Sequence, residues 1–260
     1  MTETEKTPPF AMRSLLILAA VVAALIYANA SGDLMRALIP RSWTGDVPYA
    51  RSMIRTAGDI MVMVALVALA GRVSPVRVLG LTGLGAPVRR PLLWAALWFV
   101  PALVVCVVFA RLASDLSWAD FAWKAIGGPI TEELFFRGLA VGVLMRLCGW
   151  SVWPACVLPA LCFGAAHIYQ GSDWETIGGV VAITTLGGLV FGWLFVRWNF
   201  NLWPPILLHA GLNGLWLVFD LGETAIGGWL GNGMRIAVLV VALATTFWLA
   251  PKRAPKVQSP

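Results

Sequence analysis

Long apolar runs separated by short polar connections follow one another along almost the whole chain. Many of these runs approach the roughly 20 residues that an α-helix needs to cross a bilayer, which predicts membrane-spanning helices. We therefore expect an all-α membrane protein built as a bundle of about eight transmembrane helices. The expected spans are residues 14–30, 56–70, 91–110, 129–148, 152–167, 177–196, 203–219 and 234–250.

Composition points the same way. Of the 260 residues, 59% are hydrophobic and only 12% are charged, which exceeds what a soluble core requires. Residues 1–260 are expected to form one transmembrane domain. The net charge of +6 is modest and its basic residues lie at the ends of spans, which favours contact with the lipid bilayer over nucleic-acid binding. No C-x-x-C pair indicates a disulfide framework or a thiolate metal site among the four cysteines, Cys106, Cys148, Cys156 and Cys162.

Polar and basic segments join the spans. Residues 1–12 are expected to be loose, and residues 32–55 to form a polar connection. The segment 72–90 is basic and rich in Gly and Pro, and we expect it to lie along a membrane surface. Residues 112–128 are expected to form an interfacial segment, and a basic tail containing Lys252, Arg253 and Lys256 ends the sequence.

The first run ends in Ala28-Asn29-Ala30, the small-residue pattern of a signal-peptidase site. The run is longer than the roughly 7–15 residues of a signal-peptide core, so a first transmembrane helix is favoured over cleavage. In the third span, Pro101 is expected to kink the helix.

A charged motif opens the fourth span. Glu132 and Glu133 are adjacent, and Arg137 follows immediately before a long apolar run. Ionisable residues at bilayer depth are costly, so three together need a reason. On a helix Glu133 and Arg137 are i,i+4 neighbours and can pair, whereas Glu132 is rotated by about 100° and stays available. The alternative is a helix start at the membrane surface, with Thr131 as its N-cap.

The chain has two histidines, and both lie in apolar surroundings. His167 closes the fifth span, and His209 lies in the seventh, one helical turn before Asn213. Either histidine alone is more often a satisfied core residue, and an Asn–His pair can simply join two helices. Together with the charged motif, however, these residues are expected to gather around a shared polar cavity, because polar groups in hydrocarbon must find one another or water.

Such a group supplies the parts for hydrolysis. A carboxylate taken out of water is a better general base, an imidazole can orient the attacking water, and imidazole and amide N–H groups can stabilise an oxyanion. Other protease chemistries fit poorly. The sequence has no Gly-x-Ser-Gly element for a serine nucleophile, no Gly-x-Gly-Asp element for an aspartyl dyad and no His-Glu-x-x-His.

The three motifs, Glu132-Glu133-x-x-x-Arg137, Phe163-x-x-x-His167 and His209-x-x-x-Asn213, resemble in order and spacing those of the CPBP (Abi) family. That family includes CAAX prenyl proteases of the Ras-converting type and bacterial relatives linked to bacteriocin processing or immunity. The resemblance covers about residues 127–219. It implies eight helices around an intramembrane cavity and an endopeptidase that cuts near the membrane-proximal or C-terminal end of a membrane-anchored protein or peptide.

The resemblance also implies roles for individual residues. Glu132 corresponds to the carboxylate that activates water with the help of His167, and His209 and Asn213 to the oxyanion-binding pair. Glu133 and Arg137 correspond to supporting residues. Metal-free catalysis is favoured because it gives Asn213 a role; the alternative is zinc bound by Glu132, His167 and His209. Straight helices would place His167 and His209 near opposite membrane faces, so tilts or a kink at Pro204-Pro205 are expected to bring them together.

Two other functions stay open from the sequence. One is a non-proteolytic immunity or scaffold protein of the same family, and the other a small transporter with a proton relay, although no repeat or broken-helix pair is evident. The short loops and the Ala, Leu and Trp content favour a bacterial inner membrane. An even number of spans places both termini on one side, and the distribution of Lys and Arg favours the cytoplasm, although the long first loop argues against it. The sequence leaves the oligomeric state and the substrate open.

Overall fold

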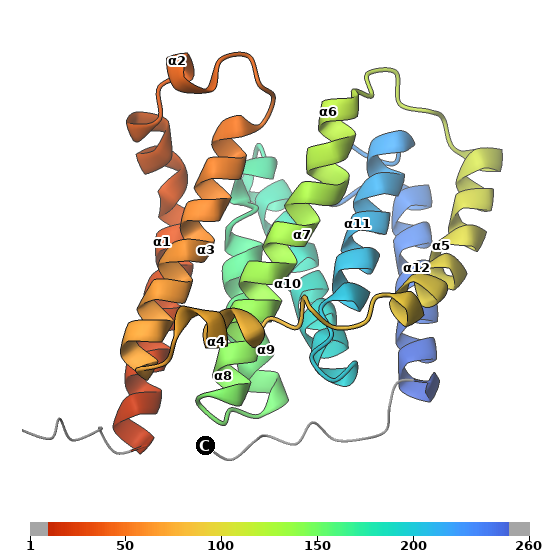
Figure 1. Cartoon of the computed structure of the whole chain (residues 1–260). Helices are drawn as coiled ribbons and strands as arrows, with labels where there is room; N and C mark the ends of the chain where they lie inside the picture. Colours follow the sequence, from red (N-terminus) through yellow and green to blue (C-terminus); the bar gives the residue numbers. More distant parts are fainter. Residues whose placement is uncertain (1–9, 250–260) are drawn as a thin grey trace, which may run out of the picture.

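The computed structural model describes residues 10–249, and these form a bundle of helices (Figure 1). The expectations for the N-terminal polar residues before Phe10 and for the basic tail from Lys252 onward lie outside the described residues. Within them the elements are α1 (Phe10–Leu38), α2 (Arg41–Thr44), α3 (Ala50–Gly71), α4 (Pro75–Gly80), α5 (Arg89–Phe109), α6 (Trp118–Asp120), η1 (Phe121–Gly127), α7 (Gly128–Glu133), η2 (Leu134–Val141), α8 (Gly142–Arg146), α9 (Val152–Ala165), η3 (Ile168–Gln170), α10 (Trp174–Arg197), α11 (Trp203–Val218) and α12 (Trp229–Leu249).

Six of these helical segments are long and apolar enough to cross a membrane. Two further segments run alongside them: the 16-residue α11, and the helix of residues 118–146, in which α6 to α8 follow one another without a break (Figure 1). The expected all-α membrane bundle is therefore confirmed. α1 begins and α12 ends at the same end of this bundle, as expected for an even number of crossings (Figure 1).

The helix of residues 118–146, called the motif helix below, begins earlier than its sequence suggested. Its N-cap is Ser117, whose hydroxyl accepts the Asp120 N–H at 3.0 Å. The alternative of Thr131 as an N-cap is therefore wrong, and residues 118–128, expected to belong to an interfacial segment, are helical. Thr131 instead donates its hydroxyl back to the carbonyls of Gly127 and Gly128, at 3.0 and 2.9 Å.

The physical reason lies in two π-helical segments, η1 before the charged motif and η2, which contains Arg137. A proline in an ordinary α-helix removes a hydrogen bond and clashes with the preceding turn. The wider π turns of η1 relax that conflict, so the helix passes through Pro129 instead of starting there.

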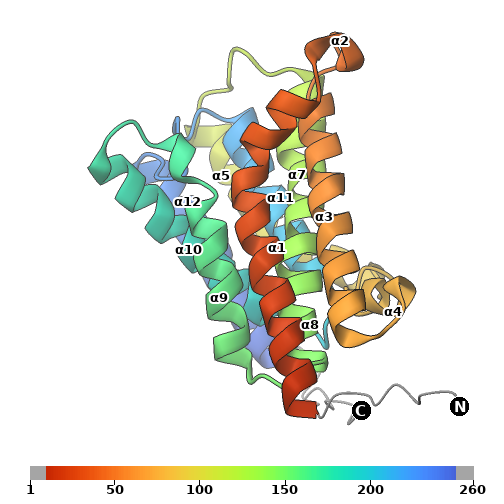
Figure 2. The same ribbon diagram turned by 90° about the vertical axis from the view of Figure 1, so that its left-hand side faces the viewer.

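The first helix continues through the possible cleavage site. α1 runs without interruption past Ala28-Asn29-Ala30 to Leu38, and it packs against α3 (Figure 2). Ile17 and Leu25 of α1 are fully buried. This helix is an integral part of the core, which supports the first-span interpretation.

The segment containing α4 crosses the bundle near the end at which α1 begins (Figure 1). Arg146, at the end of the motif helix, donates to the Leu81 carbonyl at 3.1 Å and lies over the Phe200 ring at 3.9 Å. Gly83 adopts a φ of +71° and approaches the Phe200 carbonyl so closely that no side chain would fit there. These contacts hold residues 81–83 against the turn between α10 and α11.

Two apolar clusters fill the bundle. One joins residues of α1, α3, the motif helix and α9; the other joins residues of α5, α10, α11 and α12. Phe163 of α9 belongs to the first cluster and Phe191 of α10 to the second. Both rings contact Arg137, so the charged motif lies where the two clusters meet.

Candidate active site

The expected pair of Glu133 and Arg137 is present and completely buried. Arg137 Nη1 donates to Glu133 Oε1 at 2.9 Å, and the two side chains are 2% and 0% exposed. The guanidinium lies over the rings of Phe163, Phe191 and Phe136, at 4.4, 5.2 and 5.9 Å from their centroids. An ion pair in such a place is retained only with good geometry, and the aromatic faces provide further attraction for the cation.

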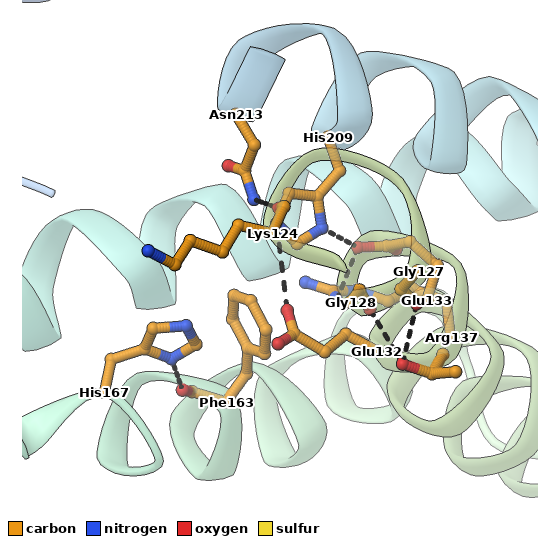
Figure 3. A network of polar contacts seen from close by, with 11 residues as sticks. Lys124, Gly127, Gly128, Glu132, Glu133, Arg137, Phe163, His167, His209 and Asn213 are labelled. Carbon is orange, nitrogen blue, oxygen red and sulfur yellow. Dashed lines mark hydrogen bonds and ion pairs between the residues drawn. The ribbon is translucent and has the colours of Figure 1, made fainter. Parts of the chain in front are cut away.

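His209 connects both carboxylates of the motif. Its Nδ1 lies 2.8 Å from Glu133 Oε1, and its Nε2 lies 3.8 Å from Glu132 Oε2 (Figure 3). Its ring stacks on Phe191 with 5.2 Å between centroids. Because a carboxylate only accepts, Nδ1 carries a proton and donates it to Glu133. The buried ion pair therefore sets the orientation of His209.

Glu132 differs from its neighbour, as the 100° rotation between adjacent helical residues predicts. Its side chain is 36% exposed, whereas that of Glu133 is 0% exposed. The structure thus separates a buried carboxylate, which accepts from Arg137 and His209, from one that remains partly accessible.

His167 lies on the other side of the Phe163 ring from His209. The Phe163 ring centroid is 4.6 Å from that of His167 and 6.0 Å from that of His209 (Figure 3). Nδ1 of His167 donates to the Phe163 carbonyl at 2.7 Å, which leaves its Nε2 as an acceptor. The described contacts include no hydrogen bond between His167 and Glu132. The structure brings the two histidines close to one ring.

The expected kink is not what brings the histidines together. Pro204 and Pro205 lie in the first turn of α11, where proline does not disturb a helix, and His209 follows within it. α9 ends after only 14 residues, and His167 follows in the turn after it. His167 closes the end of α9 by donating from Nδ1 to the carbonyl of Phe163, four residues back.

Asn213 makes a contact that the sequence did not indicate. Its Nδ2 donates to the backbone carbonyl of Lys124 at 3.0 Å (Figure 3). Lys124 and the phenylalanines around Arg137 are therefore parts of the site that sequence reasoning missed. Phe163 stood within a motif without a role, and the others carried no local signal, because their importance comes from contacts between distant helices.

The family-model comparison covers the same part of the chain. Residues 96–215 match the family model described as type II CAAX prenyl endopeptidase Rce1-like. The chain is also 31% identical over 103 residues to CAAX prenyl protease 2 of Saccharomyces cerevisiae, a match that covers 34% of this chain and 33% of the yeast protein. The similarity thus spans about a third of the yeast protein's length. No solved structure matches the chain. All six site residues predicted from the sequence lie inside the matched segment.

Proposed function

Because residues 96–215 match the Rce1-like family model, we propose that the chain is an intramembrane endopeptidase. It hydrolyses a peptide bond in a membrane-associated or C-terminal segment of a protein or peptide. The observation that carries this proposal is the pairing of the accessible Glu132 with His209, whose other ring nitrogen is held by the buried Glu133–Arg137 pair. A base next to an oriented imidazole is the arrangement that hydrolysis of an amide needs.

In this mechanism Glu132 takes a proton from water as the oxygen of that water adds to the carbonyl carbon of the peptide. The carbonyl oxygen becomes an oxyanion, and the tetrahedral intermediate then breaks its C–N bond. Glu132 returns the proton to the departing amine, so that the acid and base roles fall to one group. His167, whose Nε2 is an acceptor, helps to orient the water.

His209 and Asn213 are proposed to stabilise the oxyanion. Since Nδ1 of His209 donates to Glu133, its Nε2 carries a second N–H only when the ring is an imidazolium. Donors held in place for a developing charge contribute about 3–4 kcal/mol each in acyl transfer.

Zinc bound by Glu132, His167 and His209 is the alternative. Both histidines have Nδ1 on an acceptor, as metal-bound histidines do. In residues 10–249, however, no group of three His, Cys, Asp or Glu side chains lies close enough to hold a metal ion. We therefore propose hydrolysis by Glu132 without a metal. Loss of peptide cleavage on treatment with a chelator, and its return with zinc, would contradict this choice.

The decisive experiment is Glu132→Gln in protein reconstituted into lipid vesicles, with cleavage of a membrane-anchored reporter peptide as the readout. We expect turnover to fall by about 10²–10⁴-fold, the usual contribution of a general base, while the reporter still binds. Glu175→Gln, an exposed change at the start of α10, is the matched control and should cleave normally. Unchanged cleavage by Glu132→Gln would refute the proposal. Reporter binding without any cleavage by the wild type would favour the immunity or scaffold function.

A further inference from the structure

In the motif helix, one backbone carbonyl shortly before Glu132 lacks the N–H donor that the π-helical pattern would give it. In η1 the hydrogen bonds reach five residues back, and the last of them runs from the Gly128 N–H to the Trp123 carbonyl. The next carbonyl is that of Lys124, whose partner in the same series would be residue 129. Pro129 stands there and has no N–H to donate. The sequence thus leaves the Lys124 carbonyl without its π-helical partner.

Asn213 supplies the missing donor. Its Nδ2 lies 3.0 Å from the Lys124 carbonyl oxygen, and α11, which carries it, packs against η1 and α7. The bond lies at an exposed edge of the two helices and joins the side chain of α11 to the backbone of η1. The hydrogen bond from Asn213 of α11 therefore replaces the intrahelical bond that residue 129 would have donated to the Lys124 carbonyl.

Among the described residues, this bond is one of two hydrogen bonds between α11 and the motif helix. The other joins His209 Nδ1 to Glu133 Oε1 at 2.8 Å. His209 and Asn213 are four residues apart on α11 and share one face. Two attachments one turn apart define both the rotation and the axial position of α11. In that position Nε2 of His209 lies 3.8 Å from Glu132 Oε2.

We propose that Asn213 is a positioning residue. By donating to the carbonyl that Pro129 leaves open, it holds α11 where His209 meets both carboxylates. The amide has a second N–H, so an oxyanion contact is compatible with this bond, but the positioning contributes more to turnover. The kinetic part of this inference rests on the proposed peptidase function.

The test restores the missing N–H. Wild type, Asn213→Ala, Pro129→Ala and the double variant Pro129→Ala/Asn213→Ala are compared for cleavage of the reporter peptide and for thermal unfolding in detergent. Asn213→Ala should lower kcat by about 10- to 100-fold and change the pH profile of kcat, because His209 loses its place between the carboxylates. The double variant should recover most of that loss and the wild-type pH profile, since the new N–H at position 129 can donate to Lys124.

Pro101→Ala/Asn213→Ala is the matched control, because Pro101 lies inside α5, away from the Lys124 carbonyl. It should show no recovery. A Pro129→Ala/Asn213→Ala protein no more active than Asn213→Ala would overturn the proposal. Stabilisation of the oxyanion would then be the remaining role of Asn213. If the wild type cleaves no reporter peptide, the proposed peptidase function is contradicted. The unfolding temperatures then decide on the bond itself: recovery in the double variant supports it, and no recovery overturns it.

Discussion

At the scale of single residues, two adjacent glutamates of one helix have opposite surroundings. Glu133 accepts from Arg137 and His209 through one oxygen, and its Oε2 has no hydrogen-bond partner among the described residues. Glu132 keeps an exposed side chain beside His209. In the proposed mechanism the first orders the site and the second reacts, and the helical rotation between neighbours is enough to separate these tasks.

Removing one member of the buried pair should therefore cost more than removing both. Arg137→Gln leaves the Glu133 charge without its cation, and we expect a loss of about 3–5 kcal/mol in the free energy of unfolding. Glu133→Gln/Arg137→Gln removes both charges and should be less destabilised than Arg137→Gln. Chemical unfolding in detergent measures both. Equal losses in the two variants would show that the pair does not act as a unit.

At the scale of elements, the position of the site depends on close packing between helices. α9 and α10 approach each other at Gly188, where an added Cβ would lie 3.0 Å from the Ala160 Cβ and 3.3 Å from Arg137 Nη2. Small residues permit such an approach between membrane helices. The guanidinium that orders the site is thus held from the side of α10 as well.

Gly188→Ala should accordingly destabilise the fold and reduce peptide cleavage. The expected cost is about 1–3 kcal/mol, as for other overpacked cores, measured by unfolding in detergent. The neighbouring Gly187 offers the control, because a Cβ there would meet nothing within 4 Å. Gly187→Ala should behave like the wild type. If both variants lose stability equally, helix flexibility rather than packing is responsible.

The start of α10 gives an element-scale prediction for pH. Asp173 is its N-cap and accepts the Thr176 N–H at 2.9 Å, and this bond, with those from the Ser172 and Thr176 hydroxyls, lowers the pKa of Asp173 below its ordinary 3.8. The charged form is therefore favoured in the folded protein. Its contribution is complete above the ordinary pKa and disappears as the pH falls through the lowered value.

Asp173→Ala should thus lower the unfolding temperature at pH 7, and the difference from the wild type should vanish at acid pH. Asp115→Ala is the control, because among the described residues the hydrogen bond of Asp115 is the one it accepts from the hydroxyl of its neighbour Ser114. Thermal unfolding across the pH range measures both. A deficit that persists unchanged in acid would show that the charge of the cap is not involved.

At the scale of the whole molecule, α1 closes one side of the bundle, and the chain enters and leaves at one end (Figures 1 and 2). Because α1 runs unbroken through Ala28-Asn29-Ala30, that segment offers no extended backbone to a signal peptidase. We propose that the protein stays uncleaved there, in a bacterial inner membrane with both termini in the cytoplasm.

The intact mass of the membrane-extracted protein should therefore include α1. A chain lacking residues 1–30 should fail to accumulate, because it would expose the partners of Ile17 and Leu25. Reporter domains fused at the two ends should show the same side of the membrane. A mature protein beginning after Ala30, or fusions on opposite sides, would contradict this topology.

The sequence by itself determined the membrane bundle, since long apolar runs admit few other solutions. It also determined the Glu133–Arg137 pair, which follows from helical spacing alone, and the three motifs that resemble those of a protease family. It did not determine where the motif helix begins, because the cap at Ser117 and the π turns depend on how Pro129 is accommodated.

Only the tertiary structure decided how these parts meet. The contact between Glu133 and His209 joins residues 76 positions apart, and that between Lys124 and Asn213 joins residues 89 positions apart. The contact between the rings of Phe163 and His209 also joins residues far apart in the sequence. Such contacts depend on the rotation and axial shift of each helix against its neighbours. Local patterns of polar and apolar residues do not encode these quantities, whereas packing and the pairing of buried polar groups set them.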